Sequence, residues 1–265
     1  IQKVYLPRWE LMLLKLCGKN IIYDFDDAIY VNEHNQSIPR KNLKRLDFAL
    51  KKANWITVEN ETNVNYAKIC GNDNSIIITG PIECTRYSPK KKAEQRDELV
   101  IGWIGGPSTT KYLEIVKKPL QLLSEKYPNF KLVLIGANGF NVEGLNIEIH
   151  PWALDTEVEL LSKFDIGIMP LYNDIWCAGK GGYKLLQYMA MGIPSIVTPV
   201  GINDDILNIG NIGFKALSEE DWINSFEKLI SDKELRLQMG KNARETALTH
   251  FSYEKYVNDL VNCFI

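Results

Sequence analysis

Residues 179–197 read GKGGYKLLQYMAMGIPSIV, a glycine-rich loop that runs into an amphipathic helix. The first turn of a helix carries backbone N–H groups without intrahelical partners, and the helix dipole places partial positive charge there. The glycines let the backbone approach a ligand closely, and Lys180 and Lys184 add full charges. This pattern predicts an anion site that suits a diphosphate. A surface turn with solvated lysines is the alternative that the loop alone leaves open.

Short apolar runs alternate with helical patterns on both sides of this loop, which is typical of βαβ units and a parallel sheet. The complete series predicts one α/β, Rossmann-like domain over residues 98–250. Its predicted strands are 99–105, 131–136, 147–151, 165–170 and 194–198, and its predicted helices are 110–126, 155–163, 183–191, 219–230 and 232–250.

The first part of the chain predicts an incomplete domain of the same class over residues 1–97. Strands are expected at 21–25, 55–58 and 75–79 and helices at 43–52 and 63–69, which are too few for a doubly wound domain. The polar, lysine-rich stretch 88–98 has the composition of a linker. Residues 251–265 predict a last helix that packs outside the completed domain. The chain begins with Ile1 in what we interpret as a helix, so we expect a fragment that lacks its N-terminal part.

The composition excludes several classes of protein. A hydrophobic fraction of 45% over 265 residues suffices for packed cores, and a net charge of −2 argues against nucleic-acid binding. Five cysteines without a CxxC spacing fit reduced thiols in the cytoplasm, and three scattered histidines give no metal cluster. No apolar run reaches the ~18 residues that a membrane span needs. We therefore expect a cytoplasmic protein.

Ligands of an open parallel sheet bind beyond the carboxyl ends of its strands. The glycine loop follows the strand that ends at Pro170, and the turn from Gly105 to Ser108 follows the first strand of the same series. Lys111 comes one helical turn later. Two glycine-lined strand ends that face one crevice, surrounded by lysines, strengthen the prediction of a diphosphate site.

These segments resemble a known family. The motifs WIGGP, VLIG, HPW, DIGIMPL, GGYKLLQYMAMGIPSIVTPVG and GKNARETALTHFSYEK, over residues 99–264, resemble the donor-binding domain of GT-B glycosyltransferases. The narrower resemblance is to the large retaining family of bacterial polysaccharide and lipid-linked sugar transferases, the family 4-like glycosyl transferases group 1. IIYDFDDAIY, WITVENETN and IIITGPIECTRYSP are similar to the second half of that family's acceptor domain. The resemblance implies a GT-B fold of two Rossmann-like domains, the first one incomplete, with the last helix crossing back to it.

The resemblance also implies which residues bind a nucleotide-diphosphate sugar. The first turn would contact the diphosphate, the segment after the third strand would hold the base, and the loop amides would bind the diphosphate and the sugar hydroxyls. A side chain on the following helix would contact the ribose. The implied donor-binding residues are Gly105, Gly106, Trp152, Leu154, Gly179, Lys180, Gly181, Gly182, Tyr183 and Gln187.

The chain departs from the Glu-x7-Glu pattern of the family, because the two positions are Gly179 and Gln187. An amide still offers a donor and an acceptor to a ribose hydroxyl. In relatives the first glutamate orients the transferred sugar. A nucleotide-sugar binding module with little or no transfer activity is therefore the alternative. A dinucleotide oxidoreductase is disfavoured, since no G-x-G-x-x-G follows a strand.

Asp24, Asp26 and Asp27 in YDFDDA invite comparison with an Asp-x-Asp metal site. At the carboxyl end of a strand, Asp26 and Asp27 would equally lie over the cleft near the reacting sugar, and we favour that interpretation. A helix cap at Asp27 is the structural alternative. We expect neither a metal nor another cofactor.

The helix over residues 40–52 places Leu43, Leu46 and Leu50 on one side and basic residues elsewhere. It is predicted as an ordinary surface helix, with docking on anionic lipid headgroups as the alternative. Docking would suit a lipid-linked acceptor and peripheral attachment to the inner face of the cytoplasmic membrane.

These features together predict a metal-independent, retaining glycosyltransferase. It would move a sugar from a UDP or GDP donor to a saccharide or lipid-linked acceptor. The departing diphosphate, stabilised by Lys111, Lys184 and the loop amides, would accept the acceptor's proton during same-face attack. Asp26 and Asp27 complete the predicted catalytic set.

Overall fold

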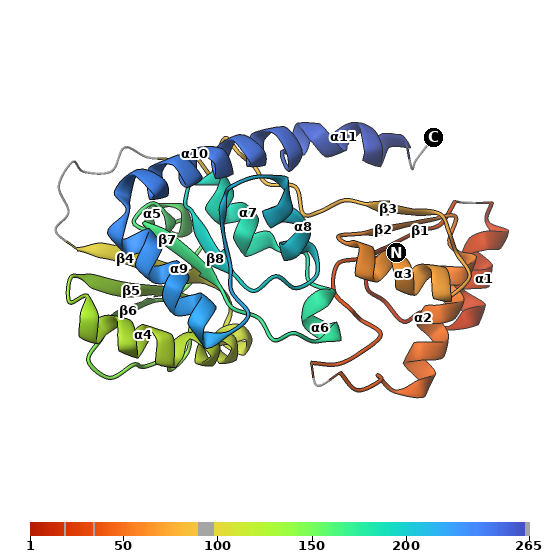
Figure 1. The fold of residues 1–265 in the computed structure, drawn as a ribbon. Coiled ribbons are helices and arrows are strands. Elements are labelled where there is room, and N and C mark those ends of the chain that lie inside the picture. Colours follow the sequence, from red (N-terminus) through yellow and green to blue (C-terminus); the bar gives the residue numbers. More distant parts are fainter. Residues whose placement is uncertain (19, 34, 90–97, 263–265) are drawn as a thin grey trace.

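The computed structural model describes residues 1–18, 20–33, 35–89 and 98–262, and its strands form two parallel sheets (Figure 1). One sheet has the order β1-β2-β3, and the six-stranded sheet has the order β6-β5-β4-β7-β8-β9. Most of the predicted linker and the end of the predicted last helix lie outside the described residues. The strands are β1 (Ile22–Phe25), β2 (Trp55–Val58), β3 (Ser75–Ile77), β4 (Leu99–Ile104), β5 (Phe130–Ile135), β6 (Asn146–His150), β7 (Ile166–Met169), β8 (Ser195–Val197) and β9 (Gly213–Lys215).

The six-stranded sheet forms where the sequence predicts buried strands, so the α/β class is confirmed. β4 pairs with β5 from Leu99 opposite Phe130 to Ile104 opposite Ile135. β7 pairs with the other side of β4. The strand order therefore reverses beside β4, which is where an open parallel sheet has its crevice.

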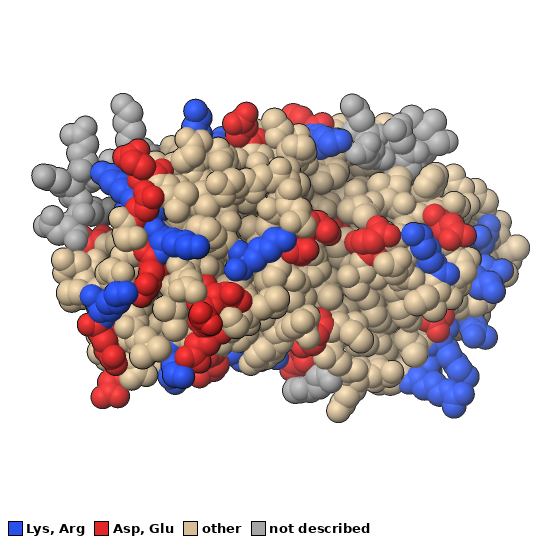
Figure 2. All heavy atoms as spheres, viewed as in Figure 1, with Lys and Arg blue, Asp and Glu red and all other residues tan. Residues whose placement is uncertain are grey.

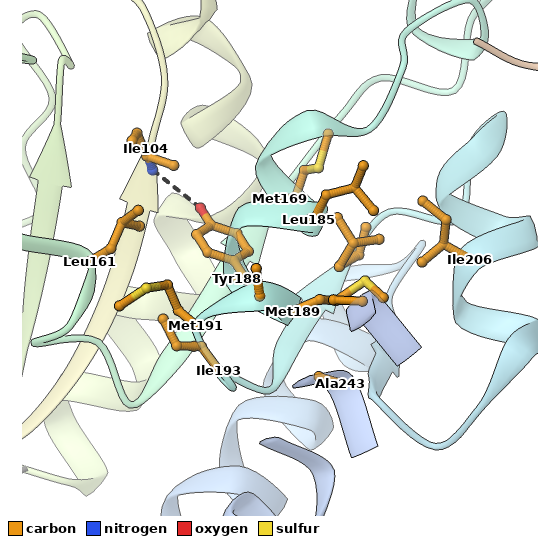
Figure 3. Close-up of a cluster of buried hydrophobic side chains, with 14 of the residues drawn as sticks. Ile104, Leu161, Met169, Leu185, Tyr188, Met189, Met191, Ile193, Ile206 and Ala243 are labelled. Atoms are coloured by element: carbon orange, nitrogen blue, oxygen red, sulfur yellow. Dashed lines mark hydrogen bonds between the residues drawn. The ribbon is translucent and has the colours of Figure 1, made fainter. Parts of the chain in front are cut away.

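Helices cover both faces of the six-stranded sheet. On one face the buried core contains Val116 of α4 and Trp222 of α9; on the other it contains Leu161 of α5 and Tyr188 of α7. The Tyr188 hydroxyl accepts a hydrogen bond from the amide of Ile104 and so joins α7 to β4 (Figure 3). The helices are α1 (Arg8–Leu16), α2 (Arg40–Lys52), α3 (Glu61–Ile69), the 3-10 helix η1 (Pro107–Leu113), α4 (Glu114–Lys126), α5 (Glu157–Leu161), α6 (Ile175–Ala178), α7 (Tyr183–Ala190), α8 (Ile202–Ile209), α9 (Glu219–Ser231), α10 (Lys233–His250) and α11 (Tyr253–Asn262).

The three-stranded sheet has its own core. Side chains along β1 alternate, so that Tyr23 and Phe25 are buried, and they pack with Leu46 and Leu50 of α2. The apolar side predicted for residues 40–52 therefore faces this sheet.

Two segments connect the parts of the chain that hold the sheets. The Ile82 amide donates to the carbonyl of Phe251, and Ile82 forms a parallel bridge with Ser252. Arg244 of α10 donates to the carbonyls of Cys84 and Tyr87. In Figure 1, α11 continues from the end of α10 toward the side of the three-stranded sheet. The domain boundaries stay predictions.

The structure corrects several details. The predicted helix at the start of the chain is wrong, because Gln2 bridges Asp24 and α1 begins at Arg8. Pro7 explains this start, since the residue before a proline is disfavoured in the α region. β9, α6 and α8 were not predicted, and the predicted helix 110–126 is divided between η1 and α4.

Within the described ranges, no helix combines the length and the apolar character that a membrane crossing needs.

Candidate functional site

A pocket of about 900 Å³ lies at the carboxyl ends of β4, β5 and β6, next to the start of α7. The segment before β4 contributes Arg86 and Tyr87 to its wall, and Glu157 comes from the first residue of α5. The predicted site residues that line it are Gly105, Gly106, Trp152, Leu154, Tyr183, Lys184 and Gln187. The structure therefore brings residues from three predicted segments together at the crevice.

The floor of the pocket contains three glycines, Gly105, Gly106 and Gly136. The Gly105 amide donates to the carbonyl of Ile135, and a Cβ on Gly136 would collide with the carbonyl oxygen of Gly105. Gly136 has φ of +78°, a conformation that glycine adopts without strain. A Cβ on Gly106 would meet nothing within 4 Å, so the turn is open at this residue, whereas one on Gly105 would collide with the Trp103 ring.

Trp152 forms one wall of the pocket, and a hydrogen bond at the edge of its indole ring holds it in place. Its side chain is 52% exposed, while its indole Nε1 donates to Oε2 of Glu157 over 2.7 Å. Fixing the indole nitrogen leaves the ring surface for stacking. Trp152 is thus arranged as an aromatic platform.

Glu157 connects this wall to the rest of the pocket. The carboxylate is almost fully buried and accepts at Oε1 from Tyr87 Oη (2.6 Å) and Arg86 Nη2 (2.8 Å). Arg86 also donates to the carbonyl of Leu154 over 2.8 Å. Gln187, likewise buried, donates from Nε2 to the Tyr87 hydroxyl over 3.2 Å. Burial and the bond to Glu157 raise the pKa of Tyr87, so it remains a neutral phenol.

Sequence reasoning missed Arg86, Tyr87 and Glu157. Arg86 and Tyr87 lie just before the predicted linker, and Glu157 comes 71 and 70 positions later. No spacing in the sequence connects positions so far apart. The one available signal was the place of Glu157 shortly after the HPW motif.

Lys184 is the predicted catalytic residue that lines the pocket. Burial, with repulsion from Lys180 as a smaller cause, lowers the pKa of its amine to about 8. Its Nζ lies 5.7 Å from the centre of the Trp103 ring. A phosphate would restore the charge of this amine, because a nearby anion favours the protonated form.

The predicted glycine loop lies beside the pocket rather than in its lining. Asn60, at the start of α3, donates to the carbonyls of Gly179 (2.9 Å) and Lys180 (3.2 Å). A Cβ on Gly179 would lie 2.5 Å from the Cβ of Ala28, and one on Gly181 would overlap the Glu59 carboxylate. Gly182 adopts a left-handed conformation before α7. In the described structure the loop packs against the part of the chain that holds the three-stranded sheet.

The other predicted catalytic residues pair with charged groups outside the pocket lining. Lys111 Nζ lies 2.6 Å from Glu33 Oε2. Asp26 and Asp27 both pair with Lys3.

Asp27 also lies 3.7 Å from Lys180, whose Nζ is 5.0 Å from the centre of the Trp176 ring. In the described part of the chain, no group of three or more His, Cys, Asp or Glu residues has a metal-binding arrangement. The catalytic roles of these residues remain predictions.

Comparisons with known proteins point to one family. The family model for "Glycosyl transferases group 1" matches residues 86–246. A GDP-Man:Man(3)GlcNAc(2)-PP-Dol alpha-1,2-mannosyltransferase from Dictyostelium discoideum is 27% identical over 216 residues, covering 66% of this chain and 42% of the relative. Spore coat protein SA from Bacillus subtilis is 23% identical over 202 residues, covering 68% of this chain and 54% of the relative. The chain thus spans about half the length of these curated relatives.

Solved structures show the same fold. HepE from Anabaena, in complex with UDP and glucose, has a TM-score of 0.76 at 15% identity. The match covers 96% of this chain and 73% of the HepE chain. TarM from S. aureus, in a structure that contains UDP, has a TM-score of 0.72 at 16% identity. The match covers 92% of this chain and 50% of the TarM chain. The chain belongs to the glycosyl transferases group 1 family and carries part of a GT-B fold.

Proposed function

We propose that this chain is the nucleotide-sugar-binding part of a glycosyltransferase. The whole enzyme would transfer a sugar from a nucleotide-diphosphate donor to a saccharide or lipid-linked acceptor. The observation that carries this proposal is the pocket at the carboxyl ends of β4–β6, with its glycine floor, its aromatic wall and Lys184. Its volume of about 900 Å³ suits a ligand of nucleotide-sugar size. HepE was solved with UDP and glucose, and the Dictyostelium relative is named for GDP-mannose, so both bases are candidates.

The pocket suggests a place for each part of the donor. The base would stack on Trp152, and a ribose hydroxyl would donate to the side-chain carbonyl of Gln187. The diphosphate would lie over the turn at Gly105 and Gly106, where Gly106 leaves open space, with Lys184 supplying positive charge. Stabilising charge that develops on the leaving diphosphate would lower the barrier to transfer.

We further propose transfer with retention and without a metal. The leaving diphosphate would accept the proton of the acceptor hydroxyl on the face from which it departs. Asp26 and Asp27, after β1, would contact the acceptor or the transferred sugar. Turnover that EDTA abolishes would contradict the metal-free proposal.

A lipid-linked acceptor would fit a peripheral membrane contact through α2. Figure 2 shows Lys and Arg side chains gathered at the end of the molecule where α2 lies. Several of the exposed residues of α2 are basic. Sedimentation with liposomes tests this contact: binding that requires anionic lipid supports it, and equal binding to neutral vesicles contradicts it.

A thermal-shift screen tests the donor proposal directly, because a ligand that binds the folded state stabilises it. UDP, GDP, UMP, UDP-glucose and GDP-mannose form the panel. A nucleotide at ~100 times its Kd should add about 2.7 kcal/mol to the free energy of unfolding. Trp152→Ala should abolish the shift. No shift with any nucleotide would overturn the proposal, whereas a shift without turnover in the whole protein would favour a binding module.

A further inference from the structure

A chain of hydrogen bonds runs between two walls of the pocket through one buried carboxylate. Trp152 donates to Oε2 of Glu157, and Tyr87 donates to Oε1. Gln187 donates to Tyr87 in turn. Glu157 is 2% exposed and Gln187 is 4% exposed. Neither side chain can exchange these partners for bulk water.

The direction of each bond follows from the number of hydrogens available. A tyrosine hydroxyl carries one hydrogen, and the bond of 2.6 Å to the Glu157 carboxylate takes it. The Tyr87 oxygen then has no hydrogen left to donate and can act only as an acceptor. The side chain at position 187 therefore has to supply an N–H or O–H group. The amide Nε2 of Gln187 does so with one of its two hydrogens, and the carbonyl Oε1 is the acceptor that this side chain keeps for another partner.

A carboxylate at position 187 would break this order. It carries no hydrogen for Tyr87, and it would put a second negative charge on a hydroxyl already bonded to Glu157. Arg86 partly balances one carboxylate, at 2.8 Å from Glu157, and it also donates to the backbone carbonyl of Leu154. Two buried carboxylates that share one hydroxyl disfavour joint ionisation.

We propose that Glu157 is the positioning carboxylate of the nucleotide pocket: it orders Tyr87 so that Gln187 presents a neutral carbonyl acceptor to a hydroxyl of the donor. Through its second oxygen Glu157 also fixes the indole against which the base would stack. The inference rests on the proposed function, because the hydroxyl in question belongs to the nucleotide sugar. Gln187 touches the ligand, whereas Glu157 acts through Tyr87 and Trp152.

The test is the pH dependence of Gln187→Glu. At pH 7.0 we expect this variant to bind UDP-glucose, or GDP-mannose if the wild type prefers it, about tenfold more weakly than the wild type. Near pH 5.5 a protonated Glu at position 187 has an O–H group for Tyr87, so the loss should shrink to about twofold. The ligand-free protein should follow the same trend, with a Tm about 5 °C below the wild type at pH 7.0 and less than 2 °C below it at pH 5.5.

Two further variants isolate the cause. Gln121→Glu adds the same charge at an exposed position of α4 and should change neither affinity nor Tm. The double variant Glu157→Gln, Gln187→Glu has one carboxylate, at position 187, among the hydrogen-bonded side chains around Tyr87. It should recover part of the affinity that Gln187→Glu alone loses.

The outcomes separate the inference from the proposed function. A wild type that binds no nucleotide overturns the function, while the ligand-free Tm values still test the hydrogen-bond order. A Gln187→Glu protein that matches the wild type in affinity and in Tm at pH 7.0 overturns the inference. A loss of equal size at both pH values would also overturn it, because the protonation of position 187 would then be irrelevant.

Discussion

The two glycine turns beside the crevice share a composition and differ in what surrounds them. At Gly106, in the pocket floor, an added Cβ would meet open space within 4 Å. At Gly179, in the loop before α7, it would meet Ala28 from the other part of the chain. The missing side chain leaves open space at Gly106, whereas at Gly179 it leaves room for the Ala28 side chain and backbone. Glycine content alone therefore does not locate a ligand.

The loop before α7 works as an interface. Asn63 joins Asn60 in donating to the carbonyl of Gly179, over 3.2 Å. Lys180 approaches Asp27 across the same boundary. This boundary brings the carboxyl end of β1 against the loop, whereas the pocket floor faces the crevice. We therefore expect substitutions in the loop to change the free energy of unfolding and substitutions in the pocket to change ligand affinity.

Gly179→Ala should show the largest effect. Its Cβ would lie 2.5 Å from the Cβ and 2.6 Å from the backbone nitrogen of Ala28, and a backbone atom cannot turn away as a flexible side chain can. We expect a loss of about 3 kcal/mol in the free energy of unfolding, measured with urea. Gly106→Ala is the matched control and should change it by less than ~0.5 kcal/mol. Equal losses in both variants would remove the distinction between the two turns.

Glu59 should give the interface a pH dependence. Burial, with repulsion from Asp27, raises the pKa of this carboxyl to about 7. A raised acid pKa means that the folded state binds more protons than the unfolded state, so stability falls as pH rises from about 4.5 to about 7. Glu59→Gln should therefore be more stable than the wild type by roughly 2 kcal/mol at pH 8 and about equal to it near pH 4.5.

Urea unfolding at both pH values measures this difference. Glu159→Gln, at an exposed position of α5, removes the same charge away from the interface and should show no such trend. A Glu59→Gln protein whose advantage does not grow with pH would show that this carboxylate is well solvated at the boundary.

Much of the fold could be predicted because it depends on local patterns. The apolar runs that became β4, β7 and residues 132–135 of β5 are continuous, as buried parallel strands require. β9 has three residues, of which Phe214 is the one large apolar side chain, so no periodicity indicates it. α6 is four residues long and gives no helical pattern either.

The site residues also divide into those that local patterns predict and those that depend on contacts between distant segments. Gly105 could be placed because it follows a strand, and the carboxyl ends of parallel strands meet at one edge of a sheet. Trp152 was assigned to the site by the resemblance to the family, and it lines the same pocket. Tyr87 and Glu157 could not, because their contact depends on how the segment before β4 folds over that edge. The packing of the glycine loop against Ala28 likewise depends on two parts of the chain meeting, which no local pattern encodes.

Two lysines beside the crevice should differ in their effect on ligand affinity. Lys184 lines the pocket, whereas Lys180 points to Trp176 and Asp27. Lys184→Met should weaken UDP-glucose binding about tenfold at pH 7, the cost of ~1.4 kcal/mol expected for one lost charge-assisted contact. Lys180→Met should stay within about twofold.

The pH dependence gives a second readout. Because the pKa of Lys184 lies at about 8, wild-type affinity should fall between pH 7 and 8.5 as the amine loses its proton. The Lys184→Met protein should lack this fall. Isothermal titration calorimetry at the two pH values measures both effects, and a larger loss in Lys180→Met would place the diphosphate at the loop instead.

Lys111 should show the smallest effect, although the resemblance to the family assigns it to the phosphates. Its amine pairs with Glu33 from the other part of the chain, and both side chains are more than a third exposed. An exposed pair of this kind contributes about 0.2–1 kcal/mol, so Lys111→Ala and Glu33→Ala should each cost less than ~1 kcal/mol and show a coupling of the same size in a double-mutant cycle. Donor affinity should change less than twofold, because the amine is already paired outside the pocket. A tenfold loss of donor affinity in Lys111→Ala that is absent from Glu33→Ala would contradict this prediction. It would mean that the Lys111 amine leaves Glu33 when the donor binds and contacts the phosphates beside Gly106.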